Sequence, residues 1–487
     1  MRLPPLHLAT AFISNKSAVP RSLHRQHLHN PSFIPLQRAL FATTALNNMK
    51  SNAATQAEGT VIVGGGIAGL AMAAALRNVA GVSNVKVLEA SNKADFESVA
   101  AGAAAQLGPN GLRALNFISS SSSSNNDDMV QKVLDMGGIL EGNVMMMPGG
   151  QTMAIPDTTL SDHGIPQVLV RWGMLRSLLA DQLPEGVVIT DAGKDIAGYQ
   201  SSSSGDDNSQ HVDMIDASGN PIVDLSPTPL IIGADGVRSA FRALVRKDVT
   251  HLTTDINDTS GEDVKYGGRI NVKAVVNKPL GEEYKSGHTH AAFAPDGSVA
   301  VFAGPAGEGL TYWAISVADT VSEGDAVTFI DGIPTGSDGK LAKDSLKEKL
   351  LTKLNSLESD PYIKTVIDLI NETSAENIFC HKSEEAKELG NHPLHSADGR
   401  VVLAGDAAHA MSASYGQAAN FALEDAATLA ACIRDGDDLM EALKDYSKKR
   451  LDRCIEMQAR SAERAAKAMK GEQVEDVSKW IFQWEIA

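Results

Sequence analysis

The chain has 487 residues and a formal net charge of −17 at pH 7, with 43% hydrophobic and 21% charged residues. This composition is ordinary for a globular α/β protein and excludes a fibrous or disordered chain. The acidic balance disfavours nucleic acid or an anionic membrane as a general partner, because both reward a basic face. No segment reaches the ~18 consecutive apolar residues that a membrane-spanning helix needs.

The three cysteines, Cys380, Cys432 and Cys454, are odd in number and contain no Cys-x-x-Cys pair. Neither a disulfide framework nor a zinc site is therefore predicted, and we expect no metal.

The first 57 residues differ in composition from the rest of the chain. They contain six Lys or Arg and four His, are rich in Ser, Ala and Leu, and have no acidic residue before Glu58. This bias is typical of a mitochondrial or plastid transit peptide. The alternative is a disordered arm upstream of a second start at Met49, which would make the protein cytoplasmic. Two serine-rich stretches, 119–128 and 201–209, indicate inserted polar loops.

The first chemical signal is a glycine turn between a strand and a helix. The β-rich run Thr60–Val63 leads into three glycines and then into the helical pattern of Leu70–Asn78. In a dinucleotide-binding turn, Gly64 would permit the tight turn, Gly66 would let the backbone approach a pyrophosphate, and Gly69 would let helix pack closely on strand.

The residues that follow complete a dinucleotide site. The N–H groups of Ile67 and Ala68 lie at the helix start, where unpaired amides bind anions. A second strand, Val85–Leu88, ends at Glu89, whose carboxylate is placed to accept hydrogen bonds from ribose hydroxyls. Strand, turn, helix and carboxylate together predict a dinucleotide site.

Two later segments favour FAD over NAD as the bound dinucleotide. The strand Val401–Ala404 ends in Gly405-Asp406 and is followed by Gly416, Ala418 and Asn420 at the start of another helix. This segment resembles the Gly-Asp motif of the single-component flavin hydroxylases, the para-hydroxybenzoate hydroxylase-like and salicylate hydroxylase-like family. The resemblance implies that Asp406 contacts the ribityl chain, and that the amides near Gly416 and Ala418 lie at the flavin ring.

Further motifs occur in the order that the family shows. The segment containing Asp235 resembles its Asp-Gly motif near the FAD pyrophosphate, and Val170–Leu175 resembles its Arg-x-x-Leu helix start, which implies that Arg171 contacts FAD. The resemblance runs from about Val61 to the C-terminus.

The chain also departs from the family pattern. Ala100 stands where an arginine is common, Ala418 replaces a glycine, and Cys380-His381-Lys382 replaces an Asp-Arg pair. These changes put some contacts to the flavin and to the active-site wall in doubt. No catalytic acid or base can be assigned; His409 lies in the Gly-Asp motif but is expected to be mostly structural.

The expected fold is α/β: a Rossmann-like FAD-binding domain interleaved with a mixed β-sheet substrate domain and a long C-terminal helix. The expected FAD-binding parts are about 58–165, 166–245 and 395–440. The substrate part is about 246–394, and the C-terminal helical region is 441–487.

The resemblance implies an FAD-dependent monooxygenase that uses NADPH or NADH and O2 to hydroxylate or epoxidise a small organic, aromatic substrate. Two alternatives stay open. One is a non-oxygenating FAD oxidoreductase, such as a reductase, halogenase or cyclase-like enzyme. The other is a degenerate FAD-binding protein.

Overall fold

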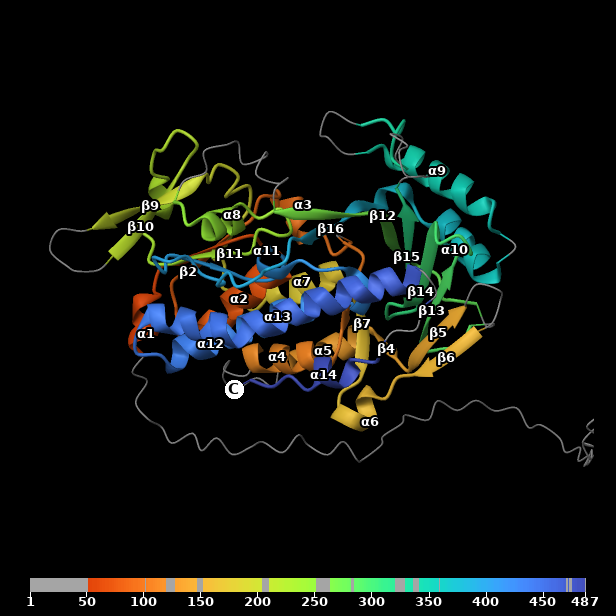
Figure 1. The fold of residues 1–487 in the computed structure, drawn as a ribbon, viewed down its shortest axis with the longest axis horizontal. Coiled ribbons are helices and arrows are strands. Elements are labelled where there is room, and N and C mark those ends of the chain that lie inside the picture. Colours follow the sequence, from red (N-terminus) through yellow and green to blue (C-terminus); the bar gives the residue numbers. More distant parts are fainter. Residues whose placement is uncertain are drawn as a thin grey trace, which may run out of the picture. The chain divides into compact units, whose positions relative to one another are not determined.

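A five-stranded parallel sheet forms the centre of the dinucleotide-binding half of this computed structural model (Figure 1). The structure describes residues 51–100, 102–119, 128–146, 152–203, 210–250, 263–281, 284–319, 329–335, 341–358, 360–469, 472 and 475–486. The strand order is β17-β11-β1-β2-β8, with bounds Val401–Leu403, Ile231–Gly233, Thr60–Val63, Val85–Leu88 and Val188–Ile189. Its middle strand, β1, is buried along its whole length, as expected for a parallel sheet that is covered on both faces.

On this half, helix α12 (Ala418–Asp435) packs against both α2 (Ile67–Asn78) and α13 (Leu439–Met469). The contact between α2 and α12 is built largely from alanine, which lets two helices approach closely because it has only a methyl group. Next to them lie α4 (Pro109–Ser119) and α7 (Trp172–Ala180). The expected long C-terminal helix is confirmed as α13.

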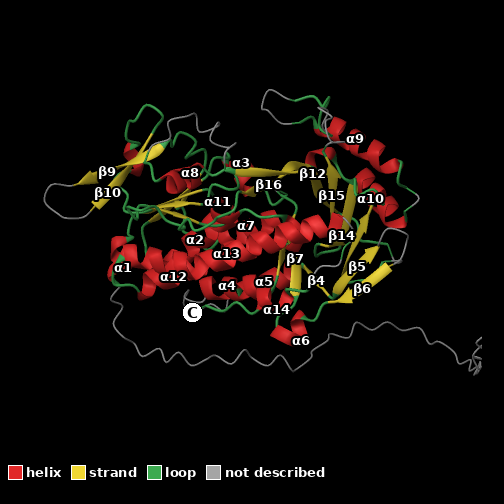
Figure 2. Ribbon diagram, viewed as in Figure 1, coloured by secondary structure: helices red, strands yellow, loops and turns green. Residues whose placement is uncertain are grey.

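A second, seven-stranded sheet forms the other half (Figure 2). Its order is β16-β12-β15-β14-β13-β5-β6, with bounds Phe379–Ala386, Val264–Val276, Thr311–Ala318, Val299–Pro305, His288–Phe293, Gly142–Met146 and Thr152–Pro156. Helices α9 (Lys343–Asn355) and α10 (Pro361–Glu372) cover one face, and a separate apolar core lies between them and the sheet.

Smaller sheets and helices complete the fold. A three-stranded sheet has the order β3-β7-β4 (Ala104–Leu107, Gln167–Arg171, Gly138–Leu140), and β9 (Gly198–Ser203) pairs with β10 (Gln210–Ile215). The remaining helices are α1 (Asn52–Gln56), α3 (Lys93–Glu97), α5 (Met129–Met136), α6 (Thr159–His163), α8 (Ala240–Lys247), α11 (Asp406–His409) and α14 (Ser478–Phe482), with η1 (Val223–Leu225), η2 (Ala375–Asn377) and η3 (Ala413–Tyr415). None of the described helices is both long and apolar enough to cross a bilayer.

The interleaved α/β architecture is as expected, but two boundaries differ. Strands β5 and β6 were assigned to the FAD-binding half and instead pair with β13 and with each other in the seven-stranded sheet. Residues 52–56 form α1, with Ala53, Ala54 and Ala57 buried, so the folded unit starts earlier than residue 58. The serine-rich loops lie mostly outside the described residues, and so does almost all of the N-terminal arm.

Leu350 anchors α9 on the seven-stranded sheet and is fully buried. We expect Leu350→Ala to lower the free energy of unfolding by about 2–5 kcal/mol, because it removes apolar contacts and leaves a cavity. Glu348→Ala, at an exposed position of the same helix, is the matched control and should change stability by less than about 0.5 kcal/mol. Urea unfolding of both variants checks this, and equal losses would contradict it.

Candidate functional site

Three helices begin beside one another, two of them at the carboxyl ends of strands of the parallel sheet. Helix α2 follows β1 with Gly66 as its N-cap, α11 follows β17 with Gly405 as its N-cap, and α12 begins after Gln417. A Cβ atom built on Gly405 would lie 2.6 Å from the Cβ of Ala68 in α2 and 3.5 Å from the Cβ of Ala422 in α12. The three helix starts therefore converge on one place.

At none of these three described helix starts does the side chain of the N-cap residue accept a hydrogen bond from the first amides of the helix. Their first amides are therefore open to a ligand, and helix N-termini attract negative charge. A Cβ on Gly66 would meet nothing within 4 Å, so the backbone faces open space there. These features fit the pyrophosphate and the ring of FAD, which both present acceptor atoms to amides.

Close backbone contacts require glycine at two positions of the turn. Gly64 has φ +113°, and a Cβ on it would lie 2.2 Å from the carbonyl oxygen of Ala234 at the end of β11. A Cβ on Gly69 would lie 1.9 Å from the carbonyl oxygen of Gly64. Side chains cannot fit at either position, which confirms the steric reasons that the spacing suggested. Ile67 and Ala68 form the first turn of α2, as expected.

Glu89 lies at the end of β2 and holds the turn. Its carboxylate accepts hydrogen bonds from the N–H of Gly65 and the N–H of Ser91, both at 2.8 Å. The side chain is half-buried next to the open start of α2. Its contact with a ribose stays a prediction.

Asp406 is exposed to solvent, yet the surrounding protein raises the pKa of its carboxyl group. The nearby cations His409 and Arg242 act in the opposite direction on this pKa. An exposed carboxylate at the start of α11 can accept hydrogen bonds from ligand hydroxyls.

Two other predicted FAD contacts have protein partners in the structure. The Asp235 carboxylate accepts hydrogen bonds from the hydroxyl of Ser239 at 2.5 Å and the N–H of Ala240 at 2.8 Å, so it caps α8. Arg171 ends β7 and lies 3.4 Å from the carboxylate of Glu308 in an exposed ion pair. Their roles toward FAD stay predictions.

The side-chain amide of Asn420 fixes the loop that precedes α12. Asn420 accepts a hydrogen bond from the N–H of Gly108 at 2.8 Å and donates to the carbonyl oxygens of Gln106 and Gly416. It is fully buried, so within the described residues it ties β3, α4 and the loop together. Gly416 has φ +64°, which favours glycine, and Ala418 is the half-buried first residue of α12.

A buried ion cluster lies behind these helix starts. Glu424 and Asp425 of α12 are fully buried, and Arg450 of α13 reaches both, at 2.5 Å and 2.7 Å. Arg453 contacts Glu424 at 2.8 Å, and the amide of Asn110 donates to the same carboxylate at 2.7 Å. Asp425 then accepts the N–H of Gly405 at 2.8 Å, which connects the cluster to the Gly-Asp turn.

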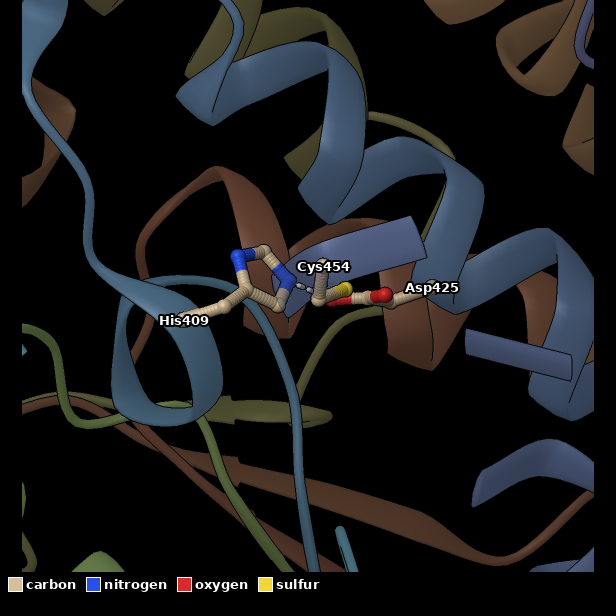
Figure 3. A group of neighbouring side chains, drawn as sticks. All are labelled: His409, Asp425 and Cys454. Carbon is tan, nitrogen blue, oxygen red and sulfur yellow. Dashed lines mark hydrogen bonds and ion pairs between the residues drawn. The ribbon is translucent and has the colours of Figure 1, made fainter. Parts of the chain in front are cut away.

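His409 belongs to this cluster, and its Nε2–H donates a hydrogen bond to the Asp425 carboxylate at 2.7 Å (Figure 3). Burial lowers the pKa of His409, but the neighbouring Cys454 sulfur and the Asp425 carboxylate outweigh it and raise the pKa well above its ordinary value. Ligand atoms of these three residues lie within 4.8 Å of one another. The Arg450 guanidinium already forms an ion pair with the Asp425 carboxylate. Its positive charge would repel a metal ion bound to these three residues. The expectation that His409 is structural agrees with its complete burial.

Sequence reasoning missed the cluster as a unit. Glu424 and Asp425 lie in α12 and Arg450 and Arg453 in α13, so their pairing spans separate helices. The local sequence does not predict that these four charged residues are buried, because charged residues of helices are usually exposed. The only hint was two adjacent acids in an otherwise apolar helix.

Comparisons with known proteins agree with this site. A family model described as an FAD binding domain matches residues 356–461. Aurachin C monooxygenase/isomerase of Stigmatella aurantiaca is 24% identical, over 82% of this chain and 87% of its own. The 3-amino-4-hydroxybenzoate 2-monooxygenase of Streptomyces cremeus is 25% identical, over 82% and 85%. The solved structure of Klebsiella pneumoniae HpxO with FAD and uric acid has the same fold, with a TM-score of 0.61, 20% identity and coverage of 87% and 91%.

Arg450→Met should lower the free energy of unfolding by about 3–5 kcal/mol, because it leaves two buried carboxylates short of a cation. Arg434→Met is the control, since Arg434 pairs with Asp435 at an exposed position of α12 and should cost at most about 1 kcal/mol. Thermal and urea unfolding at neutral pH provide the comparison. A loss from Arg450→Met no larger than that from Arg434→Met would contradict the role given to the cluster.

Proposed function

We propose that this chain is an FAD-dependent monooxygenase that uses NAD(P)H and O2 to hydroxylate a small aromatic substrate. The observation that carries the proposal is the convergence of three uncapped helix starts around Gly66, Asp406 and Ala418. The relatives that align with most of the chain are named as monooxygenases, which favours oxygenation over the non-oxygenating alternatives.

FAD, when bound, supplies the electron transfer and the reaction with O2. The residues of this chain would bind and orient it. The start of α2 would hold the pyrophosphate, Glu89 the ribose, and Asp406 the ribityl chain, while the start of α12 would face the ring and favour its negatively charged reduced form. Catalysis would then depend on position and on exclusion of water from the site.

The seven-stranded sheet supports a separate place for the substrate. Its inner face is not covered by α9 and α10, and it comes next to the FAD half because α11 packs against β16. A substrate held on this face would lie near the flavin ring without a second nucleotide domain.

The first test is a visible spectrum of the purified chain before and after anaerobic NADPH or NADH, followed by air and a panel of phenols. We expect a yellow protein that bleaches with one nucleotide and consumes O2 faster with some aromatic compounds. Bound FAD that neither nucleotide reduces, with or without these compounds, would contradict the monooxygenase proposal.

Asp406→Asn should weaken FAD binding by about 10- to 100-fold, because it removes a charged acceptor worth roughly 1.5–3 kcal/mol. Flavin fluorescence during titration of the apoprotein with FAD measures the dissociation constant. Asp435→Asn, an exposed aspartate of α12, is the control and should bind FAD like the unchanged chain. Equal affinities for all three proteins would remove Asp406 from the site.

We also propose that the basic N-terminal arm directs the protein to a mitochondrion or plastid. The support is composition alone: six basic and no acidic residues before Glu58. A fluorescent protein fused after residue 57 should enter one of these organelles, and a fusion that starts at Met49 should stay in the cytosol. Cytosolic fluorescence from the longer fusion would contradict the proposal.

A further inference from the structure

A chain of side-chain hydrogen bonds runs through the three-stranded sheet and ends near the loop before α12. Asp157 follows β6, Gln167 begins β7, and Gln106 lies in the neighbouring strand β3. The Nε2 of Gln106 donates to the Oε1 of Gln167 at 2.7 Å, and the Nε2 of Gln167 donates to the Asp157 carboxylate at 2.6 Å. All three side chains are half-buried.

The carboxylate of Asp157 sets the direction of both bonds in this chain. An ionised carboxylate only accepts hydrogen bonds, whereas a glutamine amide has a donor end and an acceptor end. Asp157 also accepts from the N–H of Thr159 at 2.7 Å and from its hydroxyl at 2.5 Å, so the carboxylate is itself held in place. Gln167 must therefore turn its NH2 group to Asp157 and its carbonyl to Gln106. Gln106 must then turn its own NH2 group to Gln167.

This orientation leaves the Oε1 of Gln106 without a hydrogen-bond partner within the described residues. Solvent reaches this oxygen, because it is not one of the buried polar atoms that lack a partner. Two amides nearby differ, since the carbonyl of Gln417 accepts from Asn110 at 3.0 Å and that of Asn420 accepts from Gly108 at 2.8 Å. Gln106 therefore presents an acceptor that the protein orients but does not itself use.

The acceptor lies beside the loop that leads into α12, where we place the flavin ring. Asn420 donates to the carbonyl oxygens of Gln106 and Gly416, at 2.9 Å and 3.0 Å, and so joins β3 to this loop. A Cβ atom built on Gly416 would lie 3.4 Å from the Oε1 of Gln106. The end of the Gln106 side chain is thus in contact distance of the loop.

The side chain of Gln106 also points away from the helices of the FAD half. Leu107, the next residue, packs in the core that those helices share, and successive side chains of a strand face opposite sides. Leu169 of β7 pairs with Gln106 and so shares its side of the sheet. A Cβ atom on Gly304 of β14 would lie 3.5 Å from the Cδ2 of Leu169. Gln106 therefore lies on the side of β3 that faces the seven-stranded sheet.

We propose that the Oε1 of Gln106 accepts a hydrogen bond from the N3–H group of FAD, and that Asp157 fixes this polarity through Gln167. The oxidised flavin ring has a single N–H donor, at N3, with a carbonyl group on each side. The uncapped amides of α12 are donors and suit those carbonyl oxygens, but N3–H needs an acceptor. Gln106 supplies one beside the same helix start. The inference rests on the proposed function, because it uses the same ring site.

The first test is the affinity of the apoprotein for FAD, followed by flavin fluorescence. Gln106→Met removes the acceptor and keeps the length of the side chain, so it should weaken binding by about 2- to 10-fold, as for one neutral hydrogen bond. Asp157→Asn should weaken binding at least as much, because an asparagine can donate to Gln167 and thereby turn the NH2 group of Gln106 toward N3–H. Asp162→Asn, exposed on α6, is the matched control and should bind FAD normally.

The second test observes the N3–H group directly, which a purely structural role of Gln106 would not affect. FAD that carries an NMR-active nitrogen isotope at N3 is bound to each oxidised protein, and the resonance of the attached proton is recorded. A hydrogen bond to a carbonyl oxygen moves this resonance downfield. We expect the downfield position in the unchanged chain and in Asp162→Asn, and an upfield shift in Gln106→Met and in Asp157→Asn.

An N3–H resonance that is the same in Gln106→Met as in the unchanged chain would overturn the proposal, even if FAD binding falls. Weaker binding of phenols to Gln106→Met, with FAD affinity and the N3–H resonance unchanged, would assign the oxygen to a substrate hydroxyl and would also overturn it. A shift in Gln106→Met but not in Asp157→Asn would overturn the role of Asp157. Failure of NAD(P)H to reduce the flavin would count against the proposed function alone, because both tests use oxidised FAD.

Discussion

Glu424 and Asp425 are adjacent carboxylates buried in α12, and such a pair is stable only with cations beside it. Arg450 satisfies both, and Arg453 and His409 complete the set. The cluster joins α12 to α13. Through the hydrogen bond from Gly405 to Asp425 it also fixes the turn that carries Asp406. A buried ionic interaction thus sets the position of the residue that we expect to contact FAD.

The second constraint is steric and acts at the glycines. Gly64 and Gly69 are held against carbonyl oxygens at distances that no Cβ could meet, and Gly405 is in contact with Ala68. These contacts bring the starts of α2 and α11 together with their amides uncapped. Steric contact shapes the backbone of the site, and the ion cluster holds it from behind. The groups that we expect to face the ligand include these amides and the carboxylates of Glu89 and Asp406.

One edge of the seven-stranded sheet departs from the family pattern. Two of the departures, His381 and Lys382, lie on β16, which pairs with β12. Burial lowers the pKa of His381 to about 4, so it is neutral at neutral pH, and Lys382 lies over the ring of Tyr266. This wall of the site therefore differs from the Asp-Arg pair that the family often has.

The sequence by itself determined the local features. The strand Thr60–Val63, the helix after the glycine turn and the place of Glu89 at the end of the second strand agree with the expectation, because strand, turn and helix preferences are written in neighbouring residues. Tertiary structure alone decided which distant residues meet. Strands β5 and β6 join the seven-stranded sheet, and the Glu424 and Arg450 pair spans two helices. Such contacts depend on register and packing between segments far apart in the chain, and no local pattern encodes them.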